Sequence, residues 1–313
     1  MENFADRLCA ATEAKDSRVC VGLDPRLESL PRGLQDAARA RRGATPNAVA
    51  ECFVEFNRRI IEAVRDVAVV VKAQVAFYEA YGPAGMEAFR RTLADAREAG
   101  LLTIADAKRN DIGSTAQAYA RAYLGGGTLW DGVAYCAYDA DAVTVNAYLG
   151  SDGIAPFIAA AKDGGKGVFV LVKTSNPSSG ELQDAVVEGH GQRLYERLAQ
   201  MVAQWGEGLV GEWGYSSVGA VVGATYPEVC ALLRQELPTV PFLVPGYGAQ
   251  GATAADVAHC FDQHGMGAVV NSSRGIIFAY QKSGHGEDAF AQAAREAAQR
   301  MRDEINEALA ARE

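Results

Sequence analysis

The sequence predicts a single α/β domain over residues 1–313, folded as a (β/α)8 TIM barrel with an extra N-terminal helix. Eight short runs rich in Val, Ile and Leu recur along the chain, and stretches with helical spacing separate them. The runs are almost continuously hydrophobic, as parallel strands buried on both faces are. Eight strand–helix units in succession favour a closed barrel over an open doubly wound sheet. A single domain is expected because no Pro/Ser-rich linker or change of composition divides the chain.

The predicted strands and helices alternate along the chain. Strands are expected at residues 18–24, 67–73, 101–107, 141–146, 167–172, 217–222, 240–244 and 267–272. The clearest helical patterns cover residues 47–66, 83–100, 191–206 and a C-terminal segment from about 286. Pro83 suits a first helical position, and Gly100 suits a helix C-terminus. The segment before the first strand is expected to lie as a helix across the N-terminal end of the barrel.

Composition limits the classes of function. Hydrophobic residues make up 49% of the chain and charged residues 22%, which is typical of a soluble globular protein. The net charge of −9 and the pI of about 5.1 argue against nucleic acid or a membrane as partner, although a local basic pocket can still bind an anionic small molecule. The charged N-terminus does not resemble a signal peptide, and no apolar run approaches ~18 residues. The six scattered cysteines predict free thiols. We therefore expect a cytoplasmic protein.

The segment IADAKRNDIGST (residues 104–115) places charged residues at the end of a predicted buried strand. Residues two apart on a strand point to one face, so Asp106 and Lys108 share a side, as do Lys72 and Gln74 on the preceding strand. If that side is the barrel interior, two ammonium groups and a carboxylate converge at the mouth, where reacting groups lie in this fold. A structural salt bridge is the alternative for Lys108.

Three further polar sites follow strand ends, and each has a structural alternative. Asp111 lies beyond its strand, so it either caps the following helix or reaches into the site of a neighbouring subunit. Asp24, in GLDP, is either a turn residue or a partner for ribose hydroxyls. Thr174, Ser175 and Asn176, in TSNPSSG, either form a plain turn or hydrogen-bond an amide or pyrimidine edge.

Two glycine-rich loops follow the last two predicted strands, PGYGAQG (245–251) and NSSRG (271–275). In TIM barrels these loops usually form a phosphate cradle from backbone N–H groups and a helix N-terminus. Gln250 adds a neutral donor and Arg274 a bidentate cation. Each residue alone is most often a solvated surface residue, but their joint position predicts a phosphorylated ligand.

Six motifs together resemble the orotidine 5′-phosphate decarboxylase family over about residues 18–280. DAKRNDIGST matches the family's D-x-K-x-x-D-I signature, and the others follow in the same order: VGLDP, VKAQVAFYEAYG, VKTSNPSSG, VPGYGAQGA and NSSRGI. The turn with T-S-N-P is similar to the longer bacterial branch of that family. The resemblance implies conversion of orotidine 5′-phosphate to UMP and CO2 in pyrimidine biosynthesis, with no cofactor and no metal.

The resemblance also implies the roles of the candidate residues. Lys72, Asp106 and Lys108 of one subunit, with Asp111 of its partner, would form an alternating charged array in a homodimer. Lys108 would stabilise the carbanion at C6 of the pyrimidine and then protonate it.

The same positions imply a set of substrate-binding residues, which are Asp24, Gln74, Ile112, Thr115, Ser175, Gln250 and Arg274. Of these, Ile112 and Thr115 would come from the partner subunit. Asp24 would hold the ribose, Ser175 the pyrimidine ring, and Gln250 and Arg274 the phosphate.

Three other functions compete with this one. A magnesium-dependent sugar-phosphate decarboxylase of the same superfamily would need a metal-binding Glu on the second strand, where this chain has Lys72. A Schiff-base aldolase would need an uncharged lysine, whereas carboxylates flank Lys108. A non-catalytic nucleotide-binding barrel would have little reason to bury two Lys–Asp pairs, and it would bind nucleotide without decarboxylating it.

Overall fold

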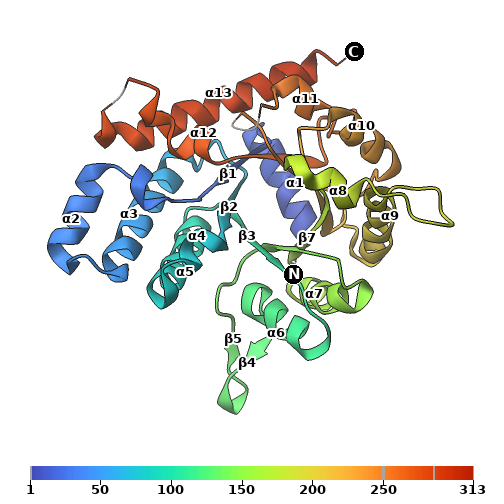
Figure 1. The fold of residues 1–313 in the computed structure, drawn as a ribbon, viewed down its shortest axis with the longest axis horizontal. Helices are drawn as coiled ribbons and strands as arrows, with labels where there is room; N and C mark the ends of the chain where they lie inside the picture. Colours follow the sequence, from blue (N-terminus) through green and yellow to red (C-terminus); the bar gives the residue numbers. More distant parts are fainter. Residues whose placement is uncertain (1, 249–250, 285, 313) are drawn as a thin grey trace.

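The computed structural model describes residues 2–248, 251–284 and 286–312. Eight parallel strands close into a barrel in chain order, and the last pairs with the first (Figure 1). They are β1 (Val19–Gly22), β2 (Val70–Gln74), β3 (Leu102–Arg109), β6 (Ala142–Val145), β7 (Gly167–Lys173), β8 (Val218–Val222), β9 (Phe242–Pro245) and β10 (Ala268–Ser272). All eight predicted strands are present within a few residues of their expected ends, which confirms the TIM barrel.

Helices surround this barrel. They are α1 (Phe4–Lys15), α2 (Arg32–Arg42), α3 (Pro46–Val64), α4 (Val75–Glu79), α5 (Gly82–Glu98), α6 (Gly113–Leu124), α7 (Ser151–Gly164), α8 (Gly180–Gln183), α9 (Leu194–Gly206), α10 (Pro227–Glu236), α11 (Ala254–Ala258), α12 (Arg274–Ile277) and α13 (Phe290–Ala310). The four clearest predicted helices correspond to α3, α5, α9 and α13. As expected, Pro83 lies in the first turn of α5, and Gly100 follows that helix with a φ of +78°.

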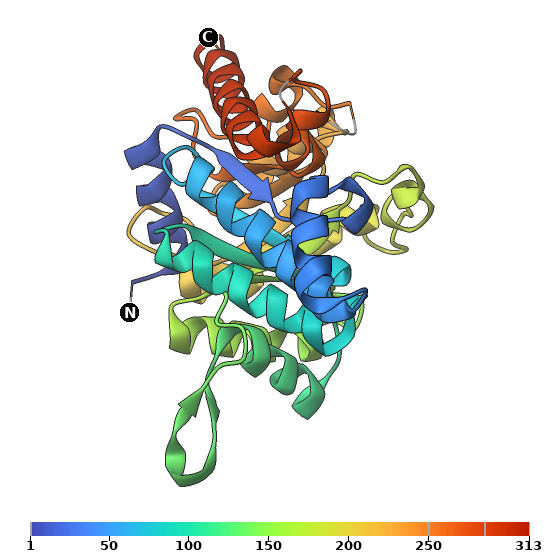
Figure 2. The same ribbon diagram turned by 90° about the vertical axis from the view of Figure 1, so that its left-hand side faces the viewer.

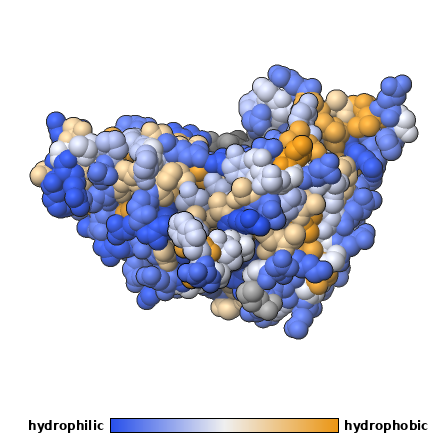
Figure 3. Space-filling view, turned by 90° about the horizontal axis from the view of Figure 1, so that it is seen from below, coloured by the Kyte–Doolittle hydropathy of each residue, from blue (hydrophilic) through white to orange (hydrophobic). Residues whose placement is uncertain are grey.

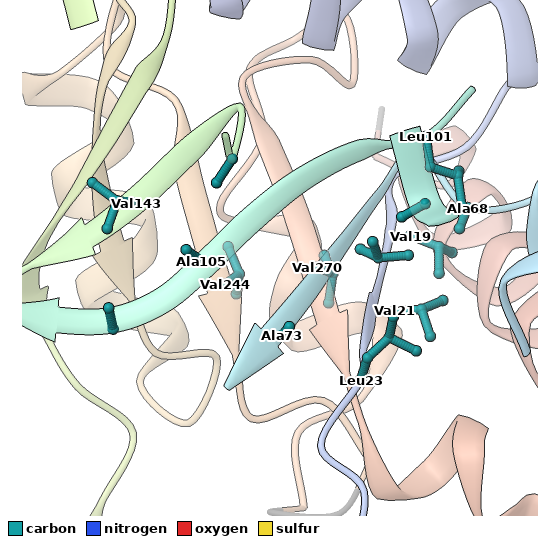
Figure 4. Close-up of a cluster of buried hydrophobic side chains, with 14 of the residues drawn as sticks. Val19, Val21, Leu23, Ala68, Ala73, Leu101, Ala105, Val143, Val244 and Val270 are labelled. Carbon is teal, nitrogen blue, oxygen red and sulfur yellow. The ribbon is translucent and has the colours of Figure 1, made fainter. Parts of the chain in front are cut away.

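The strands separate two hydrophobic cores, because successive side chains point to opposite faces. The outer core, toward the helices, includes Val19, Val21, Leu23, Ala73, Ala105, Val143, Val244 and Val270 (Figure 4). The core inside the barrel includes Cys20, Val70, Ile104, Ala142, Phe169, Val221, Leu243 and Val269. Residues two further along the strands from this inner core therefore also face the interior, nearer the C-terminal strand ends.

Helix α1 closes the N-terminal end of the barrel, as predicted. The ring of Phe4 meets that of Phe169 edge-on at 5.9 Å, and Arg7 Nη1 lies 2.6 Å from Asp141 Oδ1. In Figure 2, α1 lies at the left end of the barrel, and the yellow-green segment near residues 180–193 projects at the right end. We call the end covered by α1 the base and the opposite end the mouth.

Two elements of the structure are not predicted from the sequence. Helix α2 lies in the segment after β1 and packs against α3. A hairpin of β4 (Gly127–Thr128) and β5 (Ala134–Tyr135) projects between α6 and β6 (Figure 1). Its exposed apolar side chains are Leu129, Trp130, Val133 and Tyr135. The face seen from below, which carries the hairpin, is otherwise largely hydrophilic, with apolar residues in separate patches (Figure 3).

Two further features bear on the sequence-based expectations. Within residues 2–248, 251–284 and 286–312, no helix combines the length and the apolar character that crossing a membrane requires. All six cysteines are free thiols, five of them buried and Cys136 half-buried.

Candidate active site

The interior face of β2 and β3 changes from apolar to charged toward the mouth. On β2, Val70 is followed at two-residue intervals by Lys72 and Gln74, and on β3 Ile104 is followed by Asp106. The register sets Gln74 beside Asp106. The pleat therefore carries hydrophobic side chains into the lower barrel and polar side chains into its upper layer.

The carboxylate of Asp106 lies between two lysines. Its Oδ2 is 2.7 Å from Lys72 Nζ, and its Oδ1 is 2.5 Å from Lys108 Nζ. Gln74 Nε2 donates to Oδ2 at 3.0 Å, and Thr144 Oγ1 donates to Oδ1 at 2.9 Å. Lys72 and Asp106 are buried, whereas the Lys108 side chain is 43% exposed. Lys108 is therefore the charged member of this array that is most accessible from the mouth.

The electrostatics keep Asp106 and Lys72 ionised. Burial alone would raise the pKa of Asp106, but the charges of Lys72 and Lys108 outweigh it and hold that pKa well below its ordinary value. Burial alone would lower the pKa of Lys72, but the negative charges of Asp106 and Asp24 raise it above its ordinary value. Asp106 is therefore a carboxylate, and Lys72 an ammonium, throughout the neutral pH range.

The backbone of Lys108 departs from a regular strand. Its φ is +48°, in the left-handed region that residues with a side chain rarely adopt, at a cost on the order of 1–3 kcal/mol. The register of β3 with β6 shifts at this point, so that residues 106–108 lie opposite Thr144 alone. Bulges of this kind re-aim side chains beside active sites. The two-residue spacing correctly predicts that the side chains of Asp106 and Lys108 converge. It assumes a regular strand, however, and the strand is irregular at this point.

A cavity of about 480 Å³ lies over the array. Its polar lining residues, besides the three charged ones, are Thr144, Thr174, Ser175, Asn176, Gln183 and Asn271. Its apolar lining residues are Leu171, Val221, Leu243 and Pro245. The charged lining consists of Lys72, Lys108 and Asp106, so the cavity carries one excess positive charge in a chain whose net charge is −9. Such a cavity favours an anionic ligand.

The loop after β7 is tied together at both ends. Lys173, which is fully buried, places Nζ 2.6 Å from Asp184 Oδ1 and 4.7 Å from the centre of the Tyr226 ring. Thr174 donates its N–H to Gln183 Oε1 at 3.0 Å, and Gln183 Nε2 donates to Thr174 Oγ1 at 2.8 Å. The segment between these contacts carries the cavity residues predicted from TSNPSSG, so it is more than a plain turn.

Four residues of the site are not among those predicted from the sequence, namely Thr144, Asn271, Gln183 and Lys173. Strand periodicity could have found the first two, because Thr144 lies two residues after the interior Ala142, and Asn271 two after the interior Val269. Lys173 could have been found because it is a charged residue at the end of a buried strand. No sequence signal identifies Gln183, whose role depends on how the loop folds back on itself.

Gln74, Asp24 and Arg274 do not line this cavity. Asp24 accepts the N–H of Gln74 at 3.3 Å, and Gln74 Oε1 accepts the N–H of Ala76 at the start of α4. Arg274 begins α12 and is exposed, and neither it nor Asp24 lines the cavity. Gln250 lies outside the described residues.

Asp111, Ile112 and Thr115 do not line the cavity of their own chain. Asp111 Oδ1 accepts the N–H of the adjacent Ile112 at 2.8 Å, and among the described residues no side chain caps the N-terminus of α6. The helix-capping alternative for Asp111 is therefore wrong. Ile112 is 52% exposed, and Tyr148, in the loop after β6, is 78% exposed, so apolar surface lies open near the mouth.

A closed (β/α)8 barrel with buried charged side chains and a cavity at the C-terminal ends of its strands belongs to the class of TIM-barrel enzymes. Residues 17–289 match the family described as orotidine 5′-phosphate decarboxylase / HUMPS family. The chain belongs to this family, as the sequence motifs predict.

Individual relatives align with this chain over almost its full length. The orotidine 5′-phosphate decarboxylase of Rhodopirellula baltica is 46% identical over 282 residues, which cover 90% of each chain. That of Caldicellulosiruptor bescii is 40% identical and covers 99% of this chain and 100% of its own. The solved structure of Leishmania donovani OMP decarboxylase is 32% identical, with a TM-score of 0.72 over 99% of this chain and 100% of that one.

Proposed function

We propose that this chain converts orotidine 5′-phosphate to UMP and CO2 in pyrimidine biosynthesis. The observation that carries the proposal is the carboxylate of Asp106 held between Lys72 and Lys108 beneath a cavity with one excess positive charge. The family membership supports the same reaction. A substrate that is an anion and that becomes a carbanion when it loses CO2 matches this charge distribution.

The mechanism follows from the chemistry of the leaving group. Loss of CO2 from C6 leaves an electron pair in the plane of the pyrimidine ring, where the π system cannot delocalise it. The protein must therefore stabilise the charge by preorganised electrostatics in a site with little water. The ammonium of Lys108 is placed to do this and then to give C6 a proton. Asp106 orients Lys108, and Lys72 keeps Asp106 ionised. None of these steps requires a cofactor.

The substrate-binding roles are part of the proposal. Ser175 would contact the pyrimidine ring, which is supported by its position in the cavity wall. Gln74 donates a hydrogen bond to the Asp106 carboxylate, and Asp24 accepts the backbone N–H of Gln74. Asp24 therefore lies beside the array, where it is suited to bind the ribose hydroxyls. Arg274 and Gln250 would bind the phosphate. Binding energy from the remote phosphate would then help to close the site around the reacting carbon.

We also propose that the active unit is a homodimer in which Asp111, Ile112 and Thr115 complete the partner's site. Their exclusion from the cavity of their own chain and the exposure of Ile112 support this arrangement. The partner's Asp111 would be the fourth charged group of the array, beside Lys72, Asp106 and Lys108. We further propose that residues 1–313 form one domain and that the protein is cytoplasmic, where its six free thiols are stable.

The reaction is tested by following the ultraviolet absorbance of orotidine 5′-phosphate with the purified protein in EDTA. We expect UMP to form at an undiminished rate in EDTA and Lys108→Ala to lower kcat/KM by at least about 10⁴-fold. Lys162→Ala, which removes an exposed lysine of α7, is the matched control and should retain full activity. A folded wild type that binds UMP but leaves the substrate absorbance unchanged would indicate a nucleotide-binding barrel. Loss of activity in EDTA would indicate the magnesium-dependent alternative.

The shared site is tested by mixing two inactive variants. In a mixed dimer of Lys108→Ala and Asp111→Ala chains, one site has both residues and the other has neither. Random exchange should restore about one quarter of wild-type activity, because half of the dimers are mixed and each has one intact site. Two variants that stay inactive after proven subunit exchange would contradict the shared site.

A further inference from the structure

We propose that Thr144 is a positioning residue that sets the geometry of the proton donor Lys108. The inference rests on the proposed function, because Thr144 would act through the proposed catalytic groups. Thr144 lies on β6 and its side chain borders the cavity, although only 1% of the residue is exposed. None of the six family-like motifs includes it.

A single hydroxyl connects the main chain of Lys108 to the carboxylate that holds its ammonium. The backbone N–H of Lys108 donates to Thr144 Oγ1 at 3.0 Å. An amide can only donate, so the hydroxyl proton is free for Asp106 Oδ1, which lies 2.9 Å away. The same Oδ1 is 2.5 Å from Lys108 Nζ. The contacts form a closed ring that runs from the Lys108 backbone through Thr144 and Asp106 back to the Lys108 side chain.

The bulge in β3 explains why this hydroxyl is needed. Residues 106–108 lie opposite Thr144 alone, so the regular ladder between β3 and β6 is interrupted at this point. The N–H of Lys108 donates to the threonine hydroxyl in place of a strand carbonyl. Lys108 also has a φ of +48°, a conformation that persists only where the surrounding structure fixes it. The Thr144 hydroxyl is the contact that fixes it.

A matched threonine lies on the neighbouring strand at the other end of the barrel. Thr103 Oγ1 donates to Asp141 Oδ2 at 2.8 Å and accepts the N–H of Asp141 at 3.0 Å. It is as buried as Thr144, but it does not border the cavity. Thr103→Val therefore measures the effect of losing a buried hydroxyl that bridges a carboxylate and an amide, without touching the site.

The kinetic test compares Thr144→Val, Thr144→Ser and Thr103→Val. We expect Thr144→Val to lower kcat by about 10²-fold with a much smaller change in KM, because displacement of a reacting group by about 1 Å has an effect of this size. Thr144→Ser keeps the oxygen and should retain most of kcat. Thr103→Val should lower the melting temperature about as much as Thr144→Val while leaving kcat within a few-fold of wild type. An unchanged kcat in Thr144→Val, or an equal loss in Thr103→Val, would refute the proposal.

A structural test separates this inference from the proposed function. In a crystal structure of Thr144→Val, we expect Lys108 to leave the left-handed region and its Nζ to move away from Asp106. If both features are retained, Thr144 does not position Lys108, whatever the substrate is. If the wild type fails to act on orotidine 5′-phosphate, the proposed function is wrong, and this structure alone decides the role of Thr144. Should the valine variant not fold, Thr144→Ala provides the same two measurements.

Discussion

Two buried carboxylates lie at opposite ends of the strand pair β3 and β6, Asp106 toward the mouth and Asp141 at the base. Each receives a hydrogen bond from a buried threonine of the neighbouring strand and pairs with at least one basic side chain. At the base, the basic side chain is Arg7 of α1, at 2.6 Å. The same three types of group are therefore used twice within one pair of strands.

The two clusters differ in charge balance and in access. The base cluster has one carboxylate with one ion-pair partner, and α1 covers that end of the barrel. The mouth cluster has one carboxylate with two lysines, and it opens into a cavity. A balanced and covered cluster can only stabilise the fold, whereas an unbalanced and open one can bind and stabilise an anion. The location of the excess charge, rather than the residue types, thus distinguishes the site.

Exchanging each carboxylate for an amide is the strongest test of this contrast. Asp106→Asn leaves Lys72 buried without its counter-charge and Lys108 without its orienting group, so kcat should fall by about 10³-fold or more. Asp141→Asn should leave kcat within a few-fold of wild type and lower the free energy of unfolding by about 1.5–3 kcal/mol, the range for a hydrogen bond to a charged group. Steady-state kinetics and urea unfolding of both variants provide the comparison. Equal losses of kcat would mean that the base cluster also shapes the site.

The fold could be predicted from the sequence because burial on both faces leaves a strong signal. All eight strands appear as short, almost continuously hydrophobic runs, and the helices between them have helical spacing. The β4–β5 hairpin could not be predicted, because its strands have two residues each and its apolar residues are exposed. A pattern that depends on burial does not detect an element that is not buried.

The site could be predicted only in part. Lys72, Asp106 and Lys108 are conspicuous because charge is rare at the end of a buried strand. Thr144 is not, since a threonine suits any strand, and its importance comes from the bulge opposite it. Likewise, the left-handed backbone of Lys108 depends on contacts between strands that residue spacing cannot express.

The pH dependence of stability offers the next test, because the mouth cluster contains groups whose pKa values are displaced. The pKa of Asp106 is lowered, so its contribution is complete above the unfolded value of about 4 and is lost as the pH falls through its folded value. The pKa of Lys72 is raised, so its contribution is complete below about 10.4 and is lost as the pH rises through its folded value. Both contributions should therefore be constant between about pH 5 and 9.

Urea unfolding of wild type and Asp106→Asn across this range measures the prediction directly. The difference in the free energy of unfolding should shrink below about pH 4, where the wild-type carboxylate loses its advantage. It should also shrink toward alkaline pH, because burial lowers the pKa of Lys72 in the variant once its counter-charge is removed. A difference that stayed constant below about pH 4 would mean that the lysines do not hold Asp106 ionised.

A smaller effect is expected from the basic side chain of the base cluster. Arg7→Met removes the ion pair with Asp141 but keeps an apolar stem over the end of the barrel, and Asp141 retains its contacts with Thr103. Stability should fall by about 1–2 kcal/mol, while kcat and KM should remain near wild type. Thermal unfolding together with steady-state kinetics checks this. A change in KM would show that the position of α1 affects the mouth through the barrel.

The smallest effect is expected from the hairpin, which directly precedes the strand that links the two clusters. Trp130 is 86% exposed, and Val133 is 56% exposed, so neither contributes a buried contact to the barrel within the described residues. Trp130→Ser combined with Val133→Ser should change the free energy of unfolding by no more than about 0.5 kcal/mol and leave kcat unaltered. A larger loss of stability, measured at several protein concentrations, would have one of two causes. A loss that depends on concentration would place the hairpin in an interface between subunits. A loss independent of concentration would mean that the hairpin stabilises β6. The contrast between the base and the mouth would then depend on an element outside the barrel.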